Sequence, residues 1–161
     1  SSISFYDLIS KTRRKIKYFL FNPYFDENKI NFIKKIKDIT LIKKLNKQII
    51  KKEKINFIYC NSVIQYIQNI DKFFFKKFIT KEVKYILFTD TYITLNEKDY
   101  IIKQHNQPIT IKVRNYKKLN NLFIQNNFEV VFKSLFKKEK IKINNRFFYF
   151  YFCNFLLKKN N

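Results

Sequence analysis

Two stretches decide the predicted fold: INFIYCNS at residues 55–62 and YILFTDT at residues 85–91. Each is a short apolar run, typical of a buried strand, that ends in small polar side chains. Asn61 and Ser62 close the first stretch, and Asp90 lies near the end of the second. Ligands of open α/β sheets bind outside the carboxyl ends of the strands, so these polar residues are candidates for a binding site. The alternative is that they are helix caps and turn residues, a role that the same side chains also serve.

Apolar spacing outward from these stretches predicts an alternation of strands and helices. The expected strands cover residues 16–21, 39–42, 55–59, 85–88, 128–135 and 146–155, and the expected helices cover residues 4–15, 26–37, 63–67, 72–79 and 116–126. Strands that alternate with helices favour a parallel sheet covered by helices. We expect the last two strands, joined by a lysine-rich loop, to form an antiparallel pair at one edge. The predicted fold class is therefore α/β, in a single domain over residues 1–161: a Rossmann-like, mostly parallel sheet flanked by helices, with a C-terminal antiparallel strand pair.

Glycine is absent from all 161 residues, whereas average usage predicts roughly eleven. Glycine lets the backbone take positive φ and approach a phosphate or a nucleotide closely. A Gly-rich cofactor loop is therefore excluded within these residues. The abundant Lys, Ile, Asn, Phe and Tyr all have AT-rich codons, which indicates a coding sequence under strong base-composition pressure.

The formal net charge is +22, and most of the basic residues are lysines. Such a charge is typical of proteins that bind nucleic acid or an anionic membrane. Base-composition pressure explains the same excess without a selected partner, because lysine codons are AT-rich. Arginine, whose planar fork binds phosphate through two hydrogen bonds, is rare here. Under either explanation we expect non-specific binding of nucleic acid at low salt.

The two cysteines, Cys60 and Cys153, lie far apart and share no metal-ligand spacing with the single histidine, His105. We therefore expect two buried free thiols and no metal site. No apolar run approaches the roughly 18 residues of a membrane span, so no transmembrane segment is predicted. The sequence starts without the apolar core of a signal peptide, and a cytoplasmic location is the simplest expectation.

The order of these elements resembles a class I S-adenosylmethionine-dependent methyltransferase. More narrowly, the chain is similar to methyltransferases from bacterial surface-polysaccharide gene clusters. The segment CNSVIQYI at residues 60–67, the strand end TDT at residues 89–91, and Gln104 ahead of Pro108 carry the resemblance. It implies a Rossmann-like fold, S-adenosylmethionine as cofactor, and a saccharide or another small molecule as methyl acceptor.

The resemblance also implies roles for individual residues. The cofactor-binding residues would be Ser4, Asn22, Asn61 and Ser62; the acceptor-binding residues would be Gln65, Tyr66 and Gln104; and the catalytic residues would be His105 and Asp90. His105 is the only side chain whose ordinary pKa lies near neutrality, so it is the candidate base.

Two of these positions depart from the family pattern. Ser4 stands where the family has the end of a Gly-rich turn, and Phe21 or Asn22 stands where it has an acidic residue that binds the ribose hydroxyls. Serine does not give the backbone the freedom of glycine, and asparagine lacks the charge of a carboxylate. The first βα unit is expected to be absent from these residues. We therefore expect a degenerate or partial methyltransferase with weak or no cofactor binding.

The alternative function is a basic protein that binds nucleic acid or another polyanion. Phe73, Phe74 and Phe75 stand next to Lys76 and Lys77, and aromatic rings together with lysines bind single strands. The other interpretation of this segment is a helix whose aromatic side covers the sheet. We expect core packing for this segment.

Overall fold

The computed structural model describes residues 17–21, 28, 31, 34–35, 39–42, 44–103, 109–143 and 146–160. The chain separates into two compact units, residues 1–49 and 50–161, and each is described by itself. Four of the predicted site residues, Ser4, Asn22, Gln104 and His105, lie outside the described residues. The helix predicted at residues 4–15 and most of the helix predicted at residues 26–37 also lie outside them.

The first unit contains a two-stranded parallel sheet. β1 (Tyr18–Leu20) pairs with β2 (Ile39–Leu41) in a register that places the last residues of the two strands opposite one another. The backbone N–H of Ile42 donates to the carbonyl of Leu20 at 2.8 Å, and both side chains are buried. Both strands lie within segments whose apolar runs predict strands.

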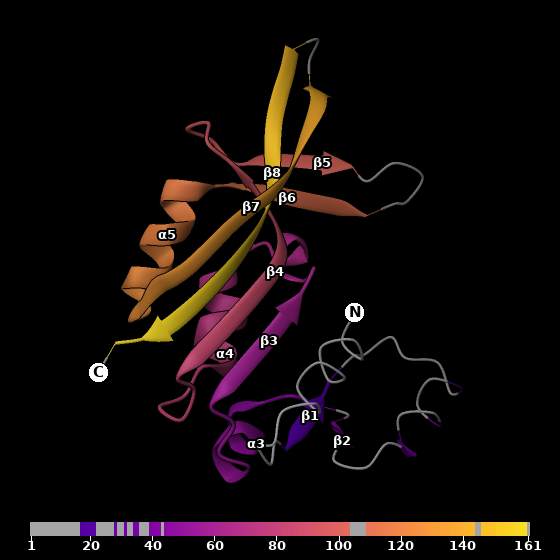
Figure 1. Cartoon of the computed structure of the whole chain (residues 1–161), viewed down its shortest axis with the longest axis vertical. Coiled ribbons are helices and arrows are strands. Elements are labelled where there is room, and N and C mark those ends of the chain that lie inside the picture. Colours follow the sequence, from indigo (N-terminus) through magenta and orange to yellow (C-terminus); the bar gives the residue numbers. More distant parts are fainter. Residues whose placement is uncertain are drawn as a thin grey trace. The chain divides into compact units, whose positions relative to one another are not determined.

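The second unit is built around β4 (Tyr85–Thr94), the central strand of a six-stranded sheet (Figure 1). β8 (Arg146–Lys159) runs antiparallel along one edge of β4, and β7 (Phe128–Ile143) runs antiparallel along the far side of β8. On the other edge of β4, β3 (Phe57–Asn61) pairs in parallel with its first half. The central strand therefore has one parallel and one antiparallel neighbour over this half.

The second half of β4 exchanges β3 for a different neighbour. β6 (Thr110–Asn115) pairs in parallel with Ile93 and Thr94, the last two residues of β4. β5 (Tyr100–Lys103) is the antiparallel partner of β6 and ends the sheet on that side. β3 and β6 thus follow one another along the same edge of β4, because β8 occupies the opposite edge at both positions.

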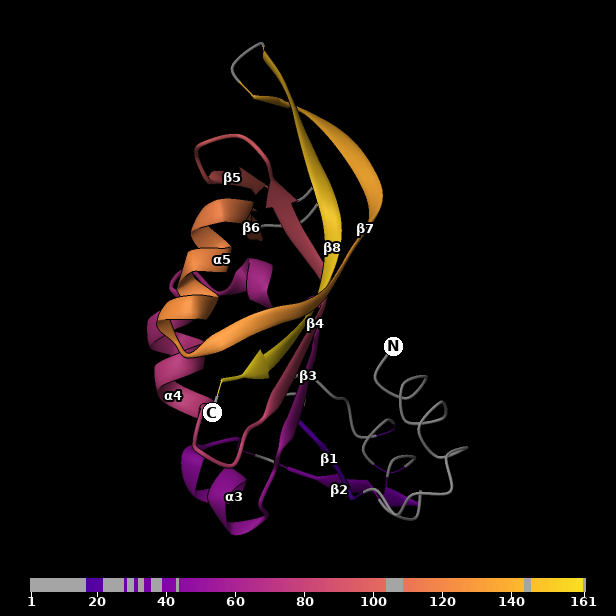
Figure 2. The same cartoon turned by 60° about the vertical axis from the view of Figure 1, so that its left-hand side comes forward.

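Short helices cover one face of this sheet. Figure 2 shows α4 (Lys76–Phe78) and α5 (Tyr116–Gln125) on the same side of β4 and β8. α4 continues the π-helical turn η2 (Asp71–Phe75), and the single 3-10 turn η1 (Ile64–Tyr66) precedes both. α5 starts after Asn115, whose side-chain oxygen accepts a hydrogen bond from the N–H of Lys118 at 2.8 Å, a helix cap of the usual kind.

Phenylalanine rings fill the core between the helices and the sheet. The Phe123 ring of α5 lies 5.9 Å from the ring of Phe88 and 5.7 Å from the ring of Phe155, and all three side chains are buried. Phe74 and Phe75 of η2 are also buried and contact this cluster. Core packing is therefore confirmed for these two residues. With no glycine or alanine as spacers, large rings fill the gap between the two layers.

The predicted Rossmann-like, mostly parallel sheet is wrong. The described part of the chain is mostly strand, in a mixed sheet whose long central pairings, β4 with β8 and β8 with β7, are antiparallel. The physical reason lies in residues 138–143, where lysines occupy every second position, as on one face of a strand. β7 therefore continues through this segment in place of the predicted loop. The resulting hairpin is long enough for β8 to run the length of β4. β5 and β6 are strands that the apolar pattern does not predict.

Most of the other predicted elements in the described residues are confirmed in type. β3, β4, β7 and β8 begin within two residues of the predicted strand starts, and α5 spans all but the last residue of the helix predicted at residues 116–126. β4 is longer than predicted because it continues through the polar residues Thr89, Asp90 and Thr91.

Among the described residues, four that are not glycine adopt positive φ: Lys54, Ser62, Asp90 and Asn127, with φ between 51° and 65°. Lys54 follows α3 (Lys47–Lys52). The N–H of Lys54 donates to the carbonyl of Lys51, and the N–H of Ile55 donates to the carbonyl of Ile50. This pair of bonds is a Schellman motif, in which the left-handed position is usually glycine. A chain without glycine therefore places a lysine in a conformation that is costly for it.

We predict that Lys54→Gly raises the free energy of unfolding by up to about 1 kcal/mol, because relief of the left-handed strain exceeds the entropy that glycine adds to the unfolded chain. The matched control is Lys52→Gly in the last turn of α3, which should lower stability by about 0.5–1 kcal/mol. Urea unfolding followed by far-UV circular dichroism measures both. Equal destabilisation by the two substitutions would contradict the strain at Lys54.

Candidate functional site

A cluster of polar side chains lies where β4 passes from β3 to β6. Thr89 Oγ1 donates to Asn61 Oδ1 at 2.8 Å, and Ser62 Oγ donates to Asp90 Oδ2 at 3.1 Å. The backbone N–H of Asp90 donates to Asn154 Oδ1 of β8 at 3.2 Å. The structure thus brings Asn61, Ser62 and Asp90 together, because the parallel pairing of β3 with β4 places Asn61, the last residue of β3, opposite Thr89.

Local backbone geometry sets the direction of these side chains. The pairing of β4 with β8 shifts register between Phe88 and Thr91, and Asp90 at the shift has a φ of 53°. Such a bulge turns a side chain away from the regular alternation of a strand. Ser62 has a φ of 51° directly after β3, and its N–H donates to the carbonyl of Thr89. The hydrogen bonds of the cluster run between its own members, so they account for its geometry without a ligand.

The predicted acceptor-binding residues that the structure describes, Gln65 and Tyr66, differ from this cluster in their burial and hydrogen bonding. Gln65 lies in η1 and is 2% exposed, and its Oε1 accepts no hydrogen bond within the described part of the chain. Tyr66 is 44% exposed. Nearby, the buried guanidinium of Arg114 donates to the carbonyl oxygens of Ile67 and Lys112, and burial lowers its pKa to about 10.

Both cysteines are free, as expected. Cys153 is buried and Cys60 is half-buried, and desolvation of each thiol by burial raises its pKa to about 12. The thiolate is the form that attacks electrophiles and binds metals, so both cysteines should react slowly near neutral pH. Within the described ranges, no group of three or more His, Cys, Asp or Glu side chains could hold a metal ion.

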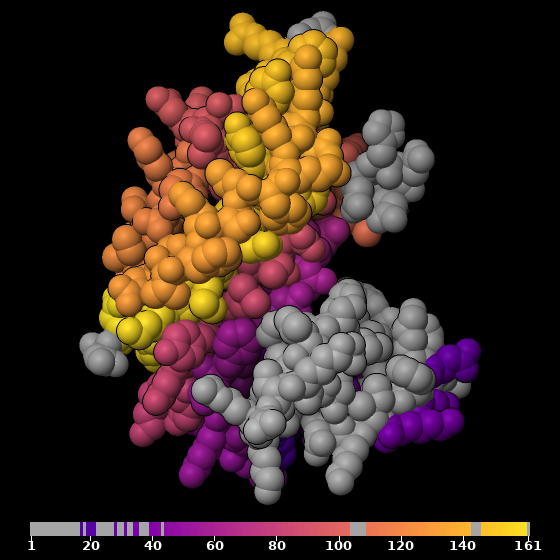
Figure 3. Space-filling model, in the orientation of Figure 1, coloured from indigo at the N-terminus to yellow at the C-terminus, as the bar shows by residue number. Residues whose placement is uncertain are grey.

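A second feature lies at the other end of the sheet, where β7 and β8 continue as a two-stranded ribbon past the last residue of β4. Tyr151 is the first residue of β8 that pairs with β4, opposite Ile93. The preceding residues of β8, from Arg146 to Phe150, pair with β7 alone. In Figure 3 the side chains of this ribbon form the top of the view. The ribbon has two faces, because successive side chains on a strand point to opposite sides.

One face of the ribbon alternates lysines with aromatic rings across the strands. Lys138 pairs with Tyr151, Lys140 with Tyr149, and Lys142 with Phe147. We call these six residues the lysine–aromatic face. The ring of Phe147 is 59% exposed, the ring of Tyr149 is 45% exposed, and all three lysines are exposed. Side chains directly opposite on an antiparallel pair point to the same side of the sheet, so the six form one continuous surface.

The ammonium groups of this face lie over its rings. Lys140 Nζ is 3.9 Å from the centre of the Phe147 ring, and Lys138 Nζ is 4.1 Å from the centre of the Tyr149 ring. Lys138 Nζ also lies 5.9 Å from the Tyr151 ring. A cation over a ring face is attracted by the quadrupole of the ring. The faces of the Tyr149 and Phe147 rings are therefore contacted by the ammonium groups of exposed lysines.

The opposite face of the ribbon is packed. Phe150 is buried against Ile102, Ile111 and Val113 of β5 and β6, with Ile141 and Phe152 beside them. Figure 2 shows β5 and β6 on one side of the ribbon. The lysine–aromatic face is therefore the side that remains open to a partner.

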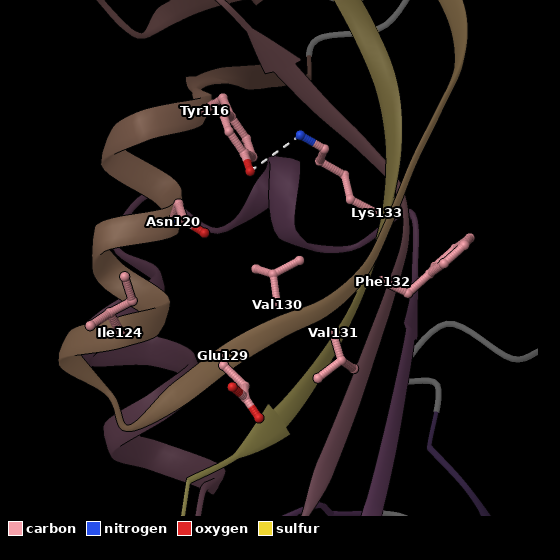
Figure 4. Close-up of a pocket in the computed structure, with 8 residues that line it drawn as sticks. All are labelled: Tyr116, Asn120, Ile124, Glu129, Val130, Val131, Phe132 and Lys133. Carbon is pink, nitrogen blue, oxygen red and sulfur yellow. Dashed lines mark hydrogen bonds between the residues drawn. The ribbon is translucent and has the colours of Figure 1, made fainter.

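A shallow hollow of about 450 Å³ lies between α5 and the first half of β7. Figure 4 shows Tyr116 and Lys133 at one end of this hollow and Glu129 at the other, with Val130 and Val131 between them. Lys133 Nζ donates to the hydroxyl of Tyr116 at 3.3 Å and lies 4.4 Å from the centre of its ring. The same combination of lysine and ring thus recurs on β7 below the ribbon.

The sequence contains a signal for the lysine–aromatic face that periodicity could have found. In KKEKIKI at residues 137–143, lysines recur at every second position from 138 to 142, and in RFFYFYF at residues 146–152, tyrosine and phenylalanine alternate from 148 to 152. A repeat of two residues is the period of a strand. If the charge of residues 137–143 is considered without this period of two, the segment is predicted to be a loop.

No family model and no curated protein matches this chain. Among the helices of the described residues, none combines the length and the apolar character needed to cross a membrane.

We predict that neither cysteine reacts rapidly with a thiol reagent in the folded protein. With a pKa of about 12 for each thiol, the thiolate fraction at about pH 8 is on the order of a thousandfold below that of an ordinary cysteine. Absorbance with Ellman's reagent should show slow labelling of the native chain and rapid labelling of two thiols in denaturant. Fast labelling of either thiol without denaturant would show that a reactive cysteine exists.

Proposed function

We propose that this protein binds nucleic acid through the lysine–aromatic face of the β7–β8 ribbon. The observation that carries the proposal is the placement of Lys138 and Lys140 over the exposed rings of Tyr149 and Phe147, on the open side of a ribbon that extends past the sheet. Lysines bind phosphates and exposed rings stack on bases, so the face offers both contacts that nucleic acid requires.

The distribution of charge supports the same site. Residues 133–143 contain five lysines against one glutamate, Glu139. Glu139 lies on the opposite face of the ribbon, because it pairs with Phe150, and it forms a salt bridge with Lys137. That salt bridge raises the pKa of Lys137. None of the six residues of the lysine–aromatic face is acidic.

The arginines of the second unit contribute little further positive charge to its surface. Arg114 is buried and donates to backbone carbonyls, so it is committed to the fold. Arg146 is exposed at the start of β8 and continues the basic character of the ribbon. The basic groups that can reach a polyanion on the ribbon are therefore mainly lysines, which act as point charges. Such contacts favour binding that does not depend on sequence.

Methyl transfer remains an untested prediction with less support. It rests on a Rossmann-like order of elements, and the observed sheet is a different one. Asn61, Ser62 and Asp90 do meet at one point, but their hydrogen bonds are directed at one another and at Asn154. The polar cluster is explained by the transition of β4 from one neighbour to the next.

The proposal is tested by fluorescence anisotropy with a labelled oligonucleotide that carries both a duplex stem and a single-stranded tail. Between about 50 and 200 mM salt, log K should fall linearly with log salt concentration. In the triple variant Lys138→Gln, Lys140→Gln, Lys142→Gln, the magnitude of the slope should decrease by about two to three, because three phosphate contacts are lost.

The matched control removes the same number of charges from the exposed residues Lys81, Lys117 and Lys118. Its slope should change by less than about one. Equal losses in the two triple variants would mean that binding follows net charge alone, and the ribbon would then not be the site. Absence of binding by the unmodified chain at about 50 mM salt would remove the proposed function altogether.

A further inference from the structure

We infer that the lysine–aromatic face selects single-stranded over double-stranded nucleic acid, by accepting unstacked bases between its rings. The inference rests on the proposed function and specifies its ligand. It follows from the spacing of the rings, from what now lies between them, and from the absence of Arg, Asn and Gln among the six residues of the face.

The rings are spaced for an inserted base. Phe147, Tyr149 and Tyr151 occupy every second position of β8 on one face, so their Cα atoms are about 6.8 Å apart along an antiparallel strand. Stacked bases are about 3.4 Å apart along one strand of DNA. A flat base inserted between two successive rings whose faces look along the strand would lie at stacking distance from both. Lys138 Nζ, which lies over the rings of Tyr149 and Tyr151, occupies such a space.

The space beside the rings is now occupied by the ammonium groups of Lys138 and Lys140. Lys138 Nζ lies 4.1 Å from the Tyr149 ring and 5.9 Å from the Tyr151 ring, and Lys140 Nζ lies 3.9 Å from the Phe147 ring. When a base enters, each ammonium group can leave its ring and pair with the phosphate that the same nucleotide carries. No bond is made or broken in this exchange, and the charge of the lysine is retained.

A duplex cannot use these positions. Its bases are stacked on both sides and paired, so they are closed to insertion unless the duplex is distorted. A two-stranded ribbon does fit the major groove, but readers of base edges there are chiefly Arg, Lys, Asn and Gln. On this face, three positions across from the lysines are rings, and two of those rings carry only a single hydroxyl. A duplex is therefore contacted chiefly by the three lysines, without any stacking of its bases on the rings.

The test compares a labelled oligothymidylate of about 15 nucleotides with a duplex of about 15 base pairs by anisotropy at one salt concentration. The unmodified protein should bind the single strand at least about tenfold more tightly, and tyrosine fluorescence should be quenched by the single strand alone. Tyr149→Leu, and separately Phe147→Leu, should weaken single-strand binding by about fivefold or more while changing duplex binding by less than about twofold.

The matched control is Phe73→Leu. Phe73 is 48% exposed and lies under Lys72 at 5.4 Å, but it belongs to η2 and not to the ribbon. This variant should bind both probes as the unmodified protein does. Equal affinity for the two probes, or equal weakening of both by Tyr149→Leu, would overturn single-strand selection and leave nucleic-acid binding in place. Failure to bind either probe would overturn both proposals.

Discussion

The antiparallel pairing of β8 with both β4 and β7 is the constraint on which the rest of the second unit depends. It places Phe155 beneath α5, where the ring lies 5.7 Å from that of Phe123. It brings Asn154 to the backbone of Asp90 at the bulge in β4. Because β8 is longer than β4, its first residues pair with β7 alone and form the ribbon. The same hairpin therefore supplies the core, orders the polar cluster and carries the proposed binding face.

Local structure and the antiparallel pairing of β7 with β8 could be predicted from this sequence, but the pairing of the other strands could not. Apolar runs and helical spacing locate β3, β4, β8 and α5, because these signals come from residues close together in the chain. The meeting of Asn61, Ser62 and Asp90 needs only that β3 and β4 are parallel neighbours, but the apolar pattern does not specify which strands are neighbours. The position of β8 beside β4 depends on contacts between distant segments, and no local pattern specifies it. The lysine-rich half of β7 was open to prediction from its period of two, but its charge favours a loop.

The missing glycines and the excess of lysine have different consequences for structure and function. In the part of the chain that the structure describes, four residues other than glycine take left-handed conformations, and Lys54 does so at a helix end where glycine is usual. A lysine over an exposed ring contributes only about 0.5–1 kcal/mol, whereas stacking of one base on a ring contributes about 1–3 kcal/mol. In the proposed binding mode, replacing the ammonium group by a base would therefore be favourable, and it would also free the ammonium group for a phosphate. Base-composition pressure can supply the lysines, while the strand period places them beside rings.

The most direct test of this account is a nuclear magnetic resonance titration that locates the ligand on the protein. In proton–carbon spectra of the free protein, the side-chain methylene signals of Lys138 and Lys140 should be shifted upfield by the rings beneath them. Addition of oligothymidylate should move these signals the most, as the ammonium groups leave the rings, while the amide signals of Asn61, Ser62 and Asp90 stay in place. The largest changes at Asn61, Ser62 and Asp90, with the two lysines unaffected, would contradict the account.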